Sequence, residues 1–236
     1  MIAYPEHVLI ELRKRVDTRG AAAGFILLGI VVTACGVLSV FLVKAAPSFD
    51  AGEVLVTTGL PAALASTIIG AVCGVGDGKA GGDRDALTAG LTRTSVYAAR
   101  ASACAVLIVG LVIMSVLVAA CCVVVAVLGG GHLGSLSVGQ QLGQVVALSF
   151  SAAGMGFGIG ASVRSLALAL VAVVLLVLVV DVTLAILGAW SEYVRFGTLQ
   201  SGLVGEAALM PTVTSGLLWV VVPIAVGWLR ARTAEV

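Results

Sequence analysis

Six times along its 236 residues, the chain passes through an apolar stretch long enough to cross a lipid bilayer. A membrane-spanning helix needs about 20 mostly apolar residues, because the hydrocarbon core is about 30 Å thick and a helix rises about 1.5 Å per residue. The sequence therefore predicts an all-α polytopic membrane protein, with six transmembrane helices in a single domain over residues 1–236. The fourth and sixth stretches are short, so we expect them to extend into their flanks or to lie partly in the interface. The predicted spans are approximately 21–43, 54–75, 101–128, 145–161, 166–188 and 214–229.

The composition is that of a chain solvated mainly by lipid. Hydrophobic residues make up 60% of the sequence and charged residues only 11%, whereas a soluble domain of this size needs far more charge on its surface. No remaining stretch is long enough for a soluble catalytic domain. The five cysteines lie in apolar stretches without a Cys-x-x-Cys or Cys/His pattern. We therefore interpret them as small buried hydrophobic residues and expect no metal site.

The positions of the 13 lysines and arginines predict the topology. Membrane proteins concentrate these residues in their cytoplasmic loops. With the N-terminus in the cytoplasm, only Lys44 and Arg195 fall outside. An odd number of spans would leave one terminal basic cluster on the wrong side, so both termini are predicted to be cytoplasmic, in a multi-pass protein of the cell membrane. The residues placed inside are Arg13, Lys14, Arg15, Arg19, Lys79, Arg84, Arg93, Arg100, Arg164, Arg230 and Arg232.

Residues 1–20 are predicted to hold an interfacial helix over 5–17, because apolar side chains recur there at helical spacing. A basic amphipathic helix of this kind lies flat on the inner leaflet, with its basic residues near anionic lipid headgroups. The alternative is an ordinary basic flank before the first span. The predicted apolar face consists of Pro5, Val8, Leu9, Leu12 and Val16. The other side holds Glu6, Arg13, Lys14 and Asp17, flanked by Glu11 and Arg15.

Small residues in two of the spans predict close helix packing. Gly70 and Gly74 form a small-xxx-small pair at the inner end of the second span, which lets another helix approach. The fourth span contains Gly154, Gly156, Gly158 and Gly160. We interpret these glycines as a packing face, since no strand precedes them as a nucleotide-binding fingerprint would require.

Residues 76–100 form the only sizeable internal loop and the most charged segment of the chain. A glycine-rich run over 76–82 precedes Asp83, which stands where a helix N-cap would stand. The segment is therefore predicted to contain a short cytoplasmic helix over roughly 84–98.

This loop carries a recognisable spacing, which resembles the motif after the second span in membrane subunits of type-2 ABC exporters. In that family an acidic residue, Gly-Thr-x-(Lys/Arg), Leu, Gly, (Ser/Thr)-Arg, Tyr and a basic residue follow one another. Here Asp77 replaces the usual Glu and Gly82 the usual Thr, and neither change removes a charge. The number of spans, the termini, the N-terminal helix and the long last outer segment match the same family. The matching residues are Asp77, Gly81, Arg84, Leu87, Gly90, Arg93, Tyr97 and Arg100.

The resemblance implies a permease subunit that works with a separate nucleotide-binding ATPase subunit. In this family the loop is a coupling helix seated in a cleft of the ATPase, and two permease subunits, identical or sister chains, pair with two ATPase subunits. ATP and Mg would be bound by that partner. The chain itself has no Gly-x-x-x-x-Gly-Lys-Ser/Thr motif, so it is not expected to be an enzyme by itself. A simpler interpretation is that Arg84, Arg93 and Arg100 only enforce topology, which would not need the Gly, Leu and Tyr spacing.

The expected function is efflux of a hydrophobic or amphipathic cargo, such as a drug, an antimicrobial peptide or a lipid, out of the cytoplasm or inner leaflet. The other partners implied are membrane lipids, and no nucleic acid. Two other classes remain open: a proton-coupled transporter or a non-transporting accessory protein, which the neighbouring gene would discriminate, and a membrane-embedded lipid enzyme. The aspartates over 77–85 resemble those of CDP-alcohol phosphotransferases only superficially, because the rest of that motif is missing. Such proton-coupled transporters usually bury several ionisable groups, and this chain offers one.

That group is Asp181, which lies inside an apolar run of the fifth span. A carboxylate within the membrane is costly and indicates a cavity, a partner or an ion route, so Asp181 is a candidate for the substrate pathway. Counting about 1.5 Å per residue from Arg164 puts it near the outer leaflet boundary, where it could instead reach headgroups or water. The segment that follows, 189–213, mixes aromatic and charged residues and is predicted to be a re-entrant or interfacial structure rather than a free loop.

Overall fold

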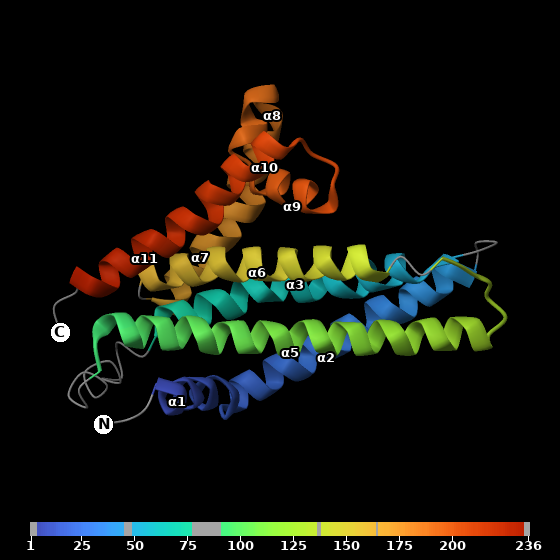
Figure 1. Ribbon diagram of the computed structural model, residues 1–236, viewed down its shortest axis with the longest axis horizontal. Helices are drawn as coiled ribbons and strands as arrows, with labels where there is room; N and C mark the ends of the chain where they lie inside the picture. Colours follow the sequence, from blue (N-terminus) through green and yellow to red (C-terminus); the bar gives the residue numbers. More distant parts are fainter. Residues whose placement is uncertain (1–3, 45–48, 77–90, 136–137, 164, 234–236) are drawn as a thin grey trace.

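The computed structural model describes residues 4–44, 49–76, 91–135, 138–163 and 165–233. Almost all of these residues are helical, and two short strands, β1 (Phe49–Asp50) and β2 (Leu133–Ser135), pair in parallel (Figure 1). The described helices are α1 (Tyr4–Val16), α2 (Arg19–Lys44), α3 (Ala51–Val75), α5 (Arg93–Leu128), α6 (Val138–Val163), α7 (Leu166–Val174), η2 (Leu175–Val180), α8 (Asp181–Ile186), η3 (Ala189–Tyr193), α9 (Phe196–Val204), α10 (Leu209–Gly216), η4 (Leu217–Val221) and α11 (Val222–Thr233).

Six of the described helical stretches are long and apolar enough to cross a membrane, which confirms the predicted number of spans and their order. The fourth and sixth are 26 and 25 residues long, because the helices continue through polar residues such as Gln140 and Thr212 beyond the apolar windows. Spans five and six each contain a π-helical stretch, η2 and η4, between two α-helical parts. The six stretches are Arg19–Phe41, Ala51–Val75, Arg93–Leu128, Val138–Val163, Leu166–Ile186 and Leu209–Thr233.

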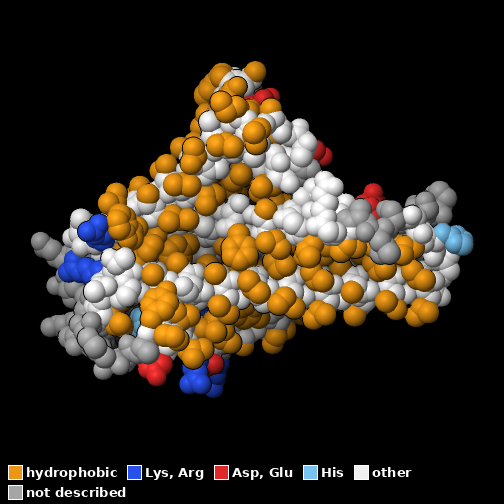
Figure 2. Space-filling view, viewed as in Figure 1, with side chains coloured by type: hydrophobic (Ala, Val, Ile, Leu, Met, Phe, Trp, Pro, Cys, Tyr) orange, Lys and Arg blue, Asp and Glu red, His pale blue; other side chains and the backbone are white. Residues whose placement is uncertain are grey.

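The start of α1 and the end of α11 lie at the same end of the helix bundle, as an even number of spans requires (Figure 1). Lys and Arg side chains gather at this end, whereas hydrophobic side chains cover the length of the bundle (Figure 2). Among the described residues, α1, the start of α2, the start of α5 and the end of α11 supply these cations. We call this the basic end. Arg195 lies at the far end of the spans, between η3 and α9.

Four glycines bring α3 and α6 into backbone contact along the halves of these helices that lie toward the basic end. A Cβ atom on any of them would lie between 2.0 and 2.3 Å from a carbonyl oxygen of the other helix, so only glycine fits. The order of the contacts shows that the two helices run in the same direction. The four glycines are Gly70, Gly74, Gly156 and Gly160, and the oxygens that they would meet belong to Ala153, Phe157, Thr67 and Ala71 respectively. The prediction that Gly70 and Gly74 admit a neighbouring helix is therefore confirmed.

Two further glycines of α6, Gly154 and Gly158, face span six. A Cβ atom at Gly158 would lie 2.2 Å from the carbonyl carbon of Pro223, and one at Gly154 would lie 3.0 Å from Val220 Cγ1. Glycines two residues apart point to opposite sides of a helix, so α6 presents one glycine face to α3 and another to η4 and α11. The predicted packing face of the fourth span is confirmed, and the structure shows two such faces on opposite sides of the helix.

The outer parts of spans five and six lean away from α3, α5 and α6 and meet α9 (Figure 1). The segment between them is folded against span six. Trp219 Nε1 donates a hydrogen bond to the carbonyl of Val194, and Ser215 Oγ donates one to the carbonyl of Arg195. The Phe196 ring packs edge-on against Trp219 at 6.1 Å between centroids. Residues 189–213 are thus a folded segment rather than a free loop, and their place in the outer interface stays a prediction.

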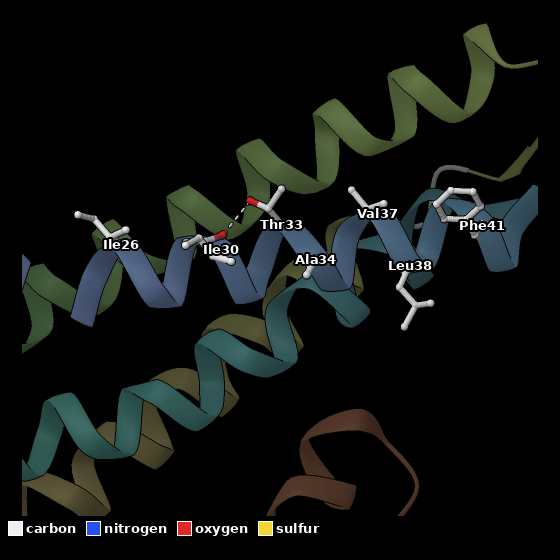
Figure 3. A pocket seen from close by; sticks show the side chains of 8 residues that line it. Ile26, Ile30, Thr33, Ala34, Val37, Leu38 and Phe41 are labelled. Carbon is white, nitrogen blue, oxygen red and sulfur yellow. Dashed lines mark hydrogen bonds between the residues drawn. The ribbon is translucent and has the colours of Figure 1, made fainter. Parts of the chain in front are cut away.

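One face of α2 is apolar and unpacked, as expected for a helix that borders lipid. Ile30, Val37 and Phe41 are among the side chains that line a shallow, open hollow along this face (Figure 3). No described atom lies within 4 Å of a Cβ position at Gly29. The hydrogen bond drawn there, from Thr33 Oγ1 to the carbonyl of Gly29 at 2.7 Å, stays within the helix and satisfies the one hydroxyl of the hollow.

The glycine contact between α3 and α6 makes a direct prediction about stability. We expect Gly156→Ala to lower the free energy of unfolding by about 1–3 kcal/mol, because the added methyl group forces the two backbones apart. The matched control is Gly110→Ala on α5, where a Cβ atom would meet nothing within 4 Å. Thermal denaturation in detergent measures both variants. Equal melting temperatures for the two would show that the close approach of α3 and α6 is not needed for stability.

Candidate coupling site at the basic end

The coupling motif falls partly within the described structure. Arg93, Tyr97 and Arg100 lie in the first turns of α5. The predicted helix over 84–98 is wrong for its last part, because Leu91 and Thr92 are not helical and residues 93–98 belong to the third span itself. The other motif residues, Asp77, Gly81, Arg84, Leu87 and Gly90, lie outside the described residues.

The start of α5 is fixed by Thr92. This residue has extended backbone angles, and its side chain accepts a hydrogen bond of 3.1 Å from the backbone N–H of Ser95. That arrangement is an N-cap, so the helix begins here and runs without a break into the apolar stretch. With 36 residues, α5 is about 54 Å long, which exceeds the hydrocarbon thickness. Its first turns therefore extend past the apolar core of a membrane, and their 4- and 3-residue spacing puts the three motif side chains on one face.

Arg93 joins α5 to the C-terminal end of α11. Its Nη1 atom donates a hydrogen bond of 3.0 Å to the backbone carbonyl of Arg232. The last carbonyls of a helix lack intrahelical donors and carry partial negative charge, so a guanidinium is a favourable partner there. The side chain of Arg232 lies over the Trp228 ring, 4.7 Å from its centroid, in a cation–π contact.

Tyr97, one turn further along, joins α5 to both α6 and α11. Its hydroxyl donates a hydrogen bond of 2.9 Å to the backbone carbonyl of Ile224. Its ring packs edge-on against Phe157 of α6, with 5.1 Å between centroids. Gly227 leaves room for α6 beside this contact, since a Cβ atom there would lie 2.8 Å from the Ala161 Cβ and 3.0 Å from the carbonyl oxygen of Gly158. A single side chain thus connects the start of span three with spans four and six.

Arg100 joins α5 to the N-terminal helix α1. Its Nε atom lies 3.8 Å from Oε2 of Glu11, and Lys14 Nζ donates to Oε1 of the same carboxylate at 3.1 Å. Glu11 is only 2% exposed and the Arg100 side chain 11% exposed, so this ion pair is screened little by solvent. The Arg100 guanidinium also covers Gly76, which ends α3 with φ of +64°, a conformation that favours glycine.

The orientation of α1 differs from the simplest reading of its sequence. The helix exists as predicted, but its buried residues are the polar His7 and Glu11, which lie against α5, while Leu9 and Val16 are exposed. Tyr4 adds a hydrogen bond of 3.0 Å between its hydroxyl and that of Ser102 on α5. The buried face of α1 thus combines these two polar residues with the half-buried Val8 and Leu12, whereas Glu6, Arg13 and Lys14 of the predicted polar side are exposed, as expected.

Asp181 lies at the far end from this site, in the fifth span. Its Oδ1 atom accepts a hydrogen bond of 3.1 Å from the backbone N–H of Gly197, in the first turn of α9. The carboxylate therefore stabilises the positive end of α9 and sits beside the Arg195 side chain, since both lie against Gly197. Its predicted role in a substrate pathway stays a prediction, and capping of α9 is a structural role that the sequence did not indicate.

Sequence reasoning found three of the residues that meet at the basic end and missed their partners. Glu11 was expected only to flank the amphipathic helix, and Phe157 was not singled out. Within the described ranges, no group of three or more His, Cys, Asp and Glu side chains could hold a metal ion. No protein-family model matches the chain, and no curated protein or solved structure matches it either.

The Glu11–Arg100 pair predicts how firmly α1 is held. We expect Glu11→Gln to lower the free energy of unfolding by about 1–3 kcal/mol and to speed amide hydrogen exchange in α1, because a neutral amide leaves the buried guanidinium poorly compensated. Asp17→Asn, an exposed carboxylate at the end of the same helix, is the control and should change neither quantity appreciably. If both variants exchange at the wild-type rate, the ion pair does not anchor α1.

Proposed function

We propose that this chain is the membrane-spanning permease subunit of a type-2 ABC exporter. The observation that carries the proposal is the face formed by Arg93, Tyr97 and Arg100. These residues end the motif of the charged loop, and they contact α1, α6 and α11 at the basic end. A loop that receives a push from a partner needs such connections, because otherwise its movement would not reach the spans.

In this proposal, ATP and Mg are bound by a separate ATPase subunit, and the residues of this chain transmit the movement. A shift of the loop displaces the first turns of α5, since α5 continues directly from it. Arg100 carries the displacement to α1 through Glu11, and Tyr97 carries it to span six through the carbonyl of Ile224. The glycine contacts make α3 and α6 a closely packed pair against which these elements move. Two copies of the chain, or one copy and a sister permease, enclose the pathway.

The proposed cargo is hydrophobic or amphipathic and enters from the cytoplasm or the inner leaflet. This choice rests on the predominance of apolar side chains on the exposed faces of the spans (Figure 2). The proposed location is the cell membrane with both termini in the cytoplasm. That orientation rests on the gathering of Lys and Arg at the basic end, since positive charge is retained on the cytoplasmic side.

The orientation is tested by labelling single cysteines in a chain whose native cysteines are replaced by alanine. We expect Gly131→Cys to react with a membrane-impermeant maleimide on intact cells, and Gly78→Cys to react only after the cells are opened. The physical reason is the charge difference between the two ends. Labelling of both sites from outside would overturn the orientation and, with it, the exporter proposal.

The coupling role is tested by a substitution in the loop. We expect Leu87→Asp to abolish co-purification with the ATPase subunit, because a buried apolar anchor of this size contributes about 2 kcal/mol. Arg84→Ala is the matched comparison and should weaken co-purification only slightly, since an exposed ion pair contributes about 0–1 kcal/mol. The membrane fold should survive both changes, as judged by gel filtration in detergent. Full retention of the ATPase by Leu87→Asp would mean that this loop is not the coupling element.

A further inference from the structure

Two buried cysteines face each other between α3 and α5, near the basic end. Cys73 is 2% exposed and Cys104 is 5% exposed, and their thiols are hydrogen-bond partners. They belong to the hydrophobic cluster that also contains Ile108 and Phe157. The chain has three other cysteines, at positions 35, 121 and 122.

The two cysteines lie near those ends of their helices that adjoin the charged loop. Cys73 lies in the last turn of α3, and Cys104 lies one turn beyond Arg100 in α5. These are the two helix ends between which the charged loop runs. Charged side chains of Glu11, Arg15 and Arg100 act electrostatically on Cys73, so the thiols border a polar region rather than a purely apolar one.

We propose that Cys73 and Cys104 are an oxidisable thiol pair whose disulfide locks α3 to α5. The oxidant is hydrogen peroxide. One cysteine, as its thiolate, attacks a peroxide oxygen, the O–O bond breaks, and the sulfur becomes a sulfenic acid while one water is released after proton transfer. The second thiol then attacks that sulfur, the S–O bond breaks, and the S–S bond forms with release of a second water. Both sulfurs are oxidised, and the peroxide is reduced to two waters.

The consequence for regulation rests on the proposed function. With the basic end in the reducing cytoplasm, the thiols are the resting state and the disulfide forms only under oxidative conditions. The disulfide would hold the end of α3 against α5. Movement of the loop between them would then no longer displace the first turns of α5. Reduction by a dithiol would restore the movement.

The disulfide is tested on the full chain with Cys35→Ala, Cys121→Ala and Cys122→Ala, which retains only the pair. After treatment with hydrogen peroxide, denaturation and N-ethylmaleimide, intact mass should show loss of two hydrogen atoms and no added maleimide. Dithiothreitol should restore two additions. The control retains Cys73 and Cys122 instead, through Cys35→Ala, Cys104→Ala and Cys121→Ala. Positions 104 and 122 are about 27 Å apart along α5, so the control should take up two maleimides after peroxide treatment. Two additions to the first variant would overturn the proposal.

The effect of the disulfide on the stability of the chain can be measured without a partner subunit. Peroxide should raise the melting temperature of the chain that retains the pair, dithiothreitol should reverse the rise, and the control should show neither change. A disulfide that leaves the melting temperature unchanged would overturn the proposal that it locks α3 to α5. In the complex with the ATPase subunit, peroxide should lower nucleotide hydrolysis several-fold in the first variant alone. Failure of that complex to assemble would contradict the exporter proposal and would leave the mass and melting results standing.

Discussion

The backbone contact of α6 with α3 on one side and span six on the other is the constraint on which the rest of the structure depends. In lipid, burying an apolar side chain between helices gives little driving force, because the lipid tails are equally apolar. Close approach through glycine gives dispersion contacts and weak Cα–H···O hydrogen bonds instead. The alternation of Gly154, Gly156, Gly158 and Gly160 supplies two such faces on one helix. It therefore makes α6 the helix that joins α3 to span six.

The contacts at the basic end follow from that arrangement. Phe157 lies among these glycines, and the ring of Tyr97 packs against it while its hydroxyl reaches span six. Arg93 donates to a carbonyl at the end of α11, and Arg100 pairs with Glu11 of α1, so charge and packing act on the same few turns of α5. Glu11 is buried on α1 where it lies beside the Arg100 guanidinium of α5. The start of α5, where the charged loop ends, is therefore connected with α1, α6 and α11.

The spans and the packing glycines could be predicted from the sequence, because hydropathy and small-residue spacing are local properties of one helix. The sequence could not indicate which partner each glycine face meets, since that depends on contacts between distant segments. The same limit applies to Glu11, whose burial requires Arg100 from another helix. The end of the predicted loop helix was misplaced because Thr92 is itself a suitable N-cap, and the sequence alone did not show that the third span begins there. The π-helical stretches η2 and η4 could not be predicted either, because their apolar sequences do not distinguish a π-helix from an α-helix.

The central claim is that the first turns of α5 connect the loop mechanically with α1 and span six. Hydrogen–deuterium exchange on the complex with its ATPase subunit, with and without ATP, measures this most directly. The account predicts that ATP changes the exchange of α1 and of the end of α11 together with that of the start of α5. It also predicts that Tyr97→Phe reduces the ATP-dependent change in exchange at the end of α11, because the hydrogen bond to Ile224 is lost. A change restricted to the loop in the wild-type chain, with α1 and α11 unaffected, would contradict the account.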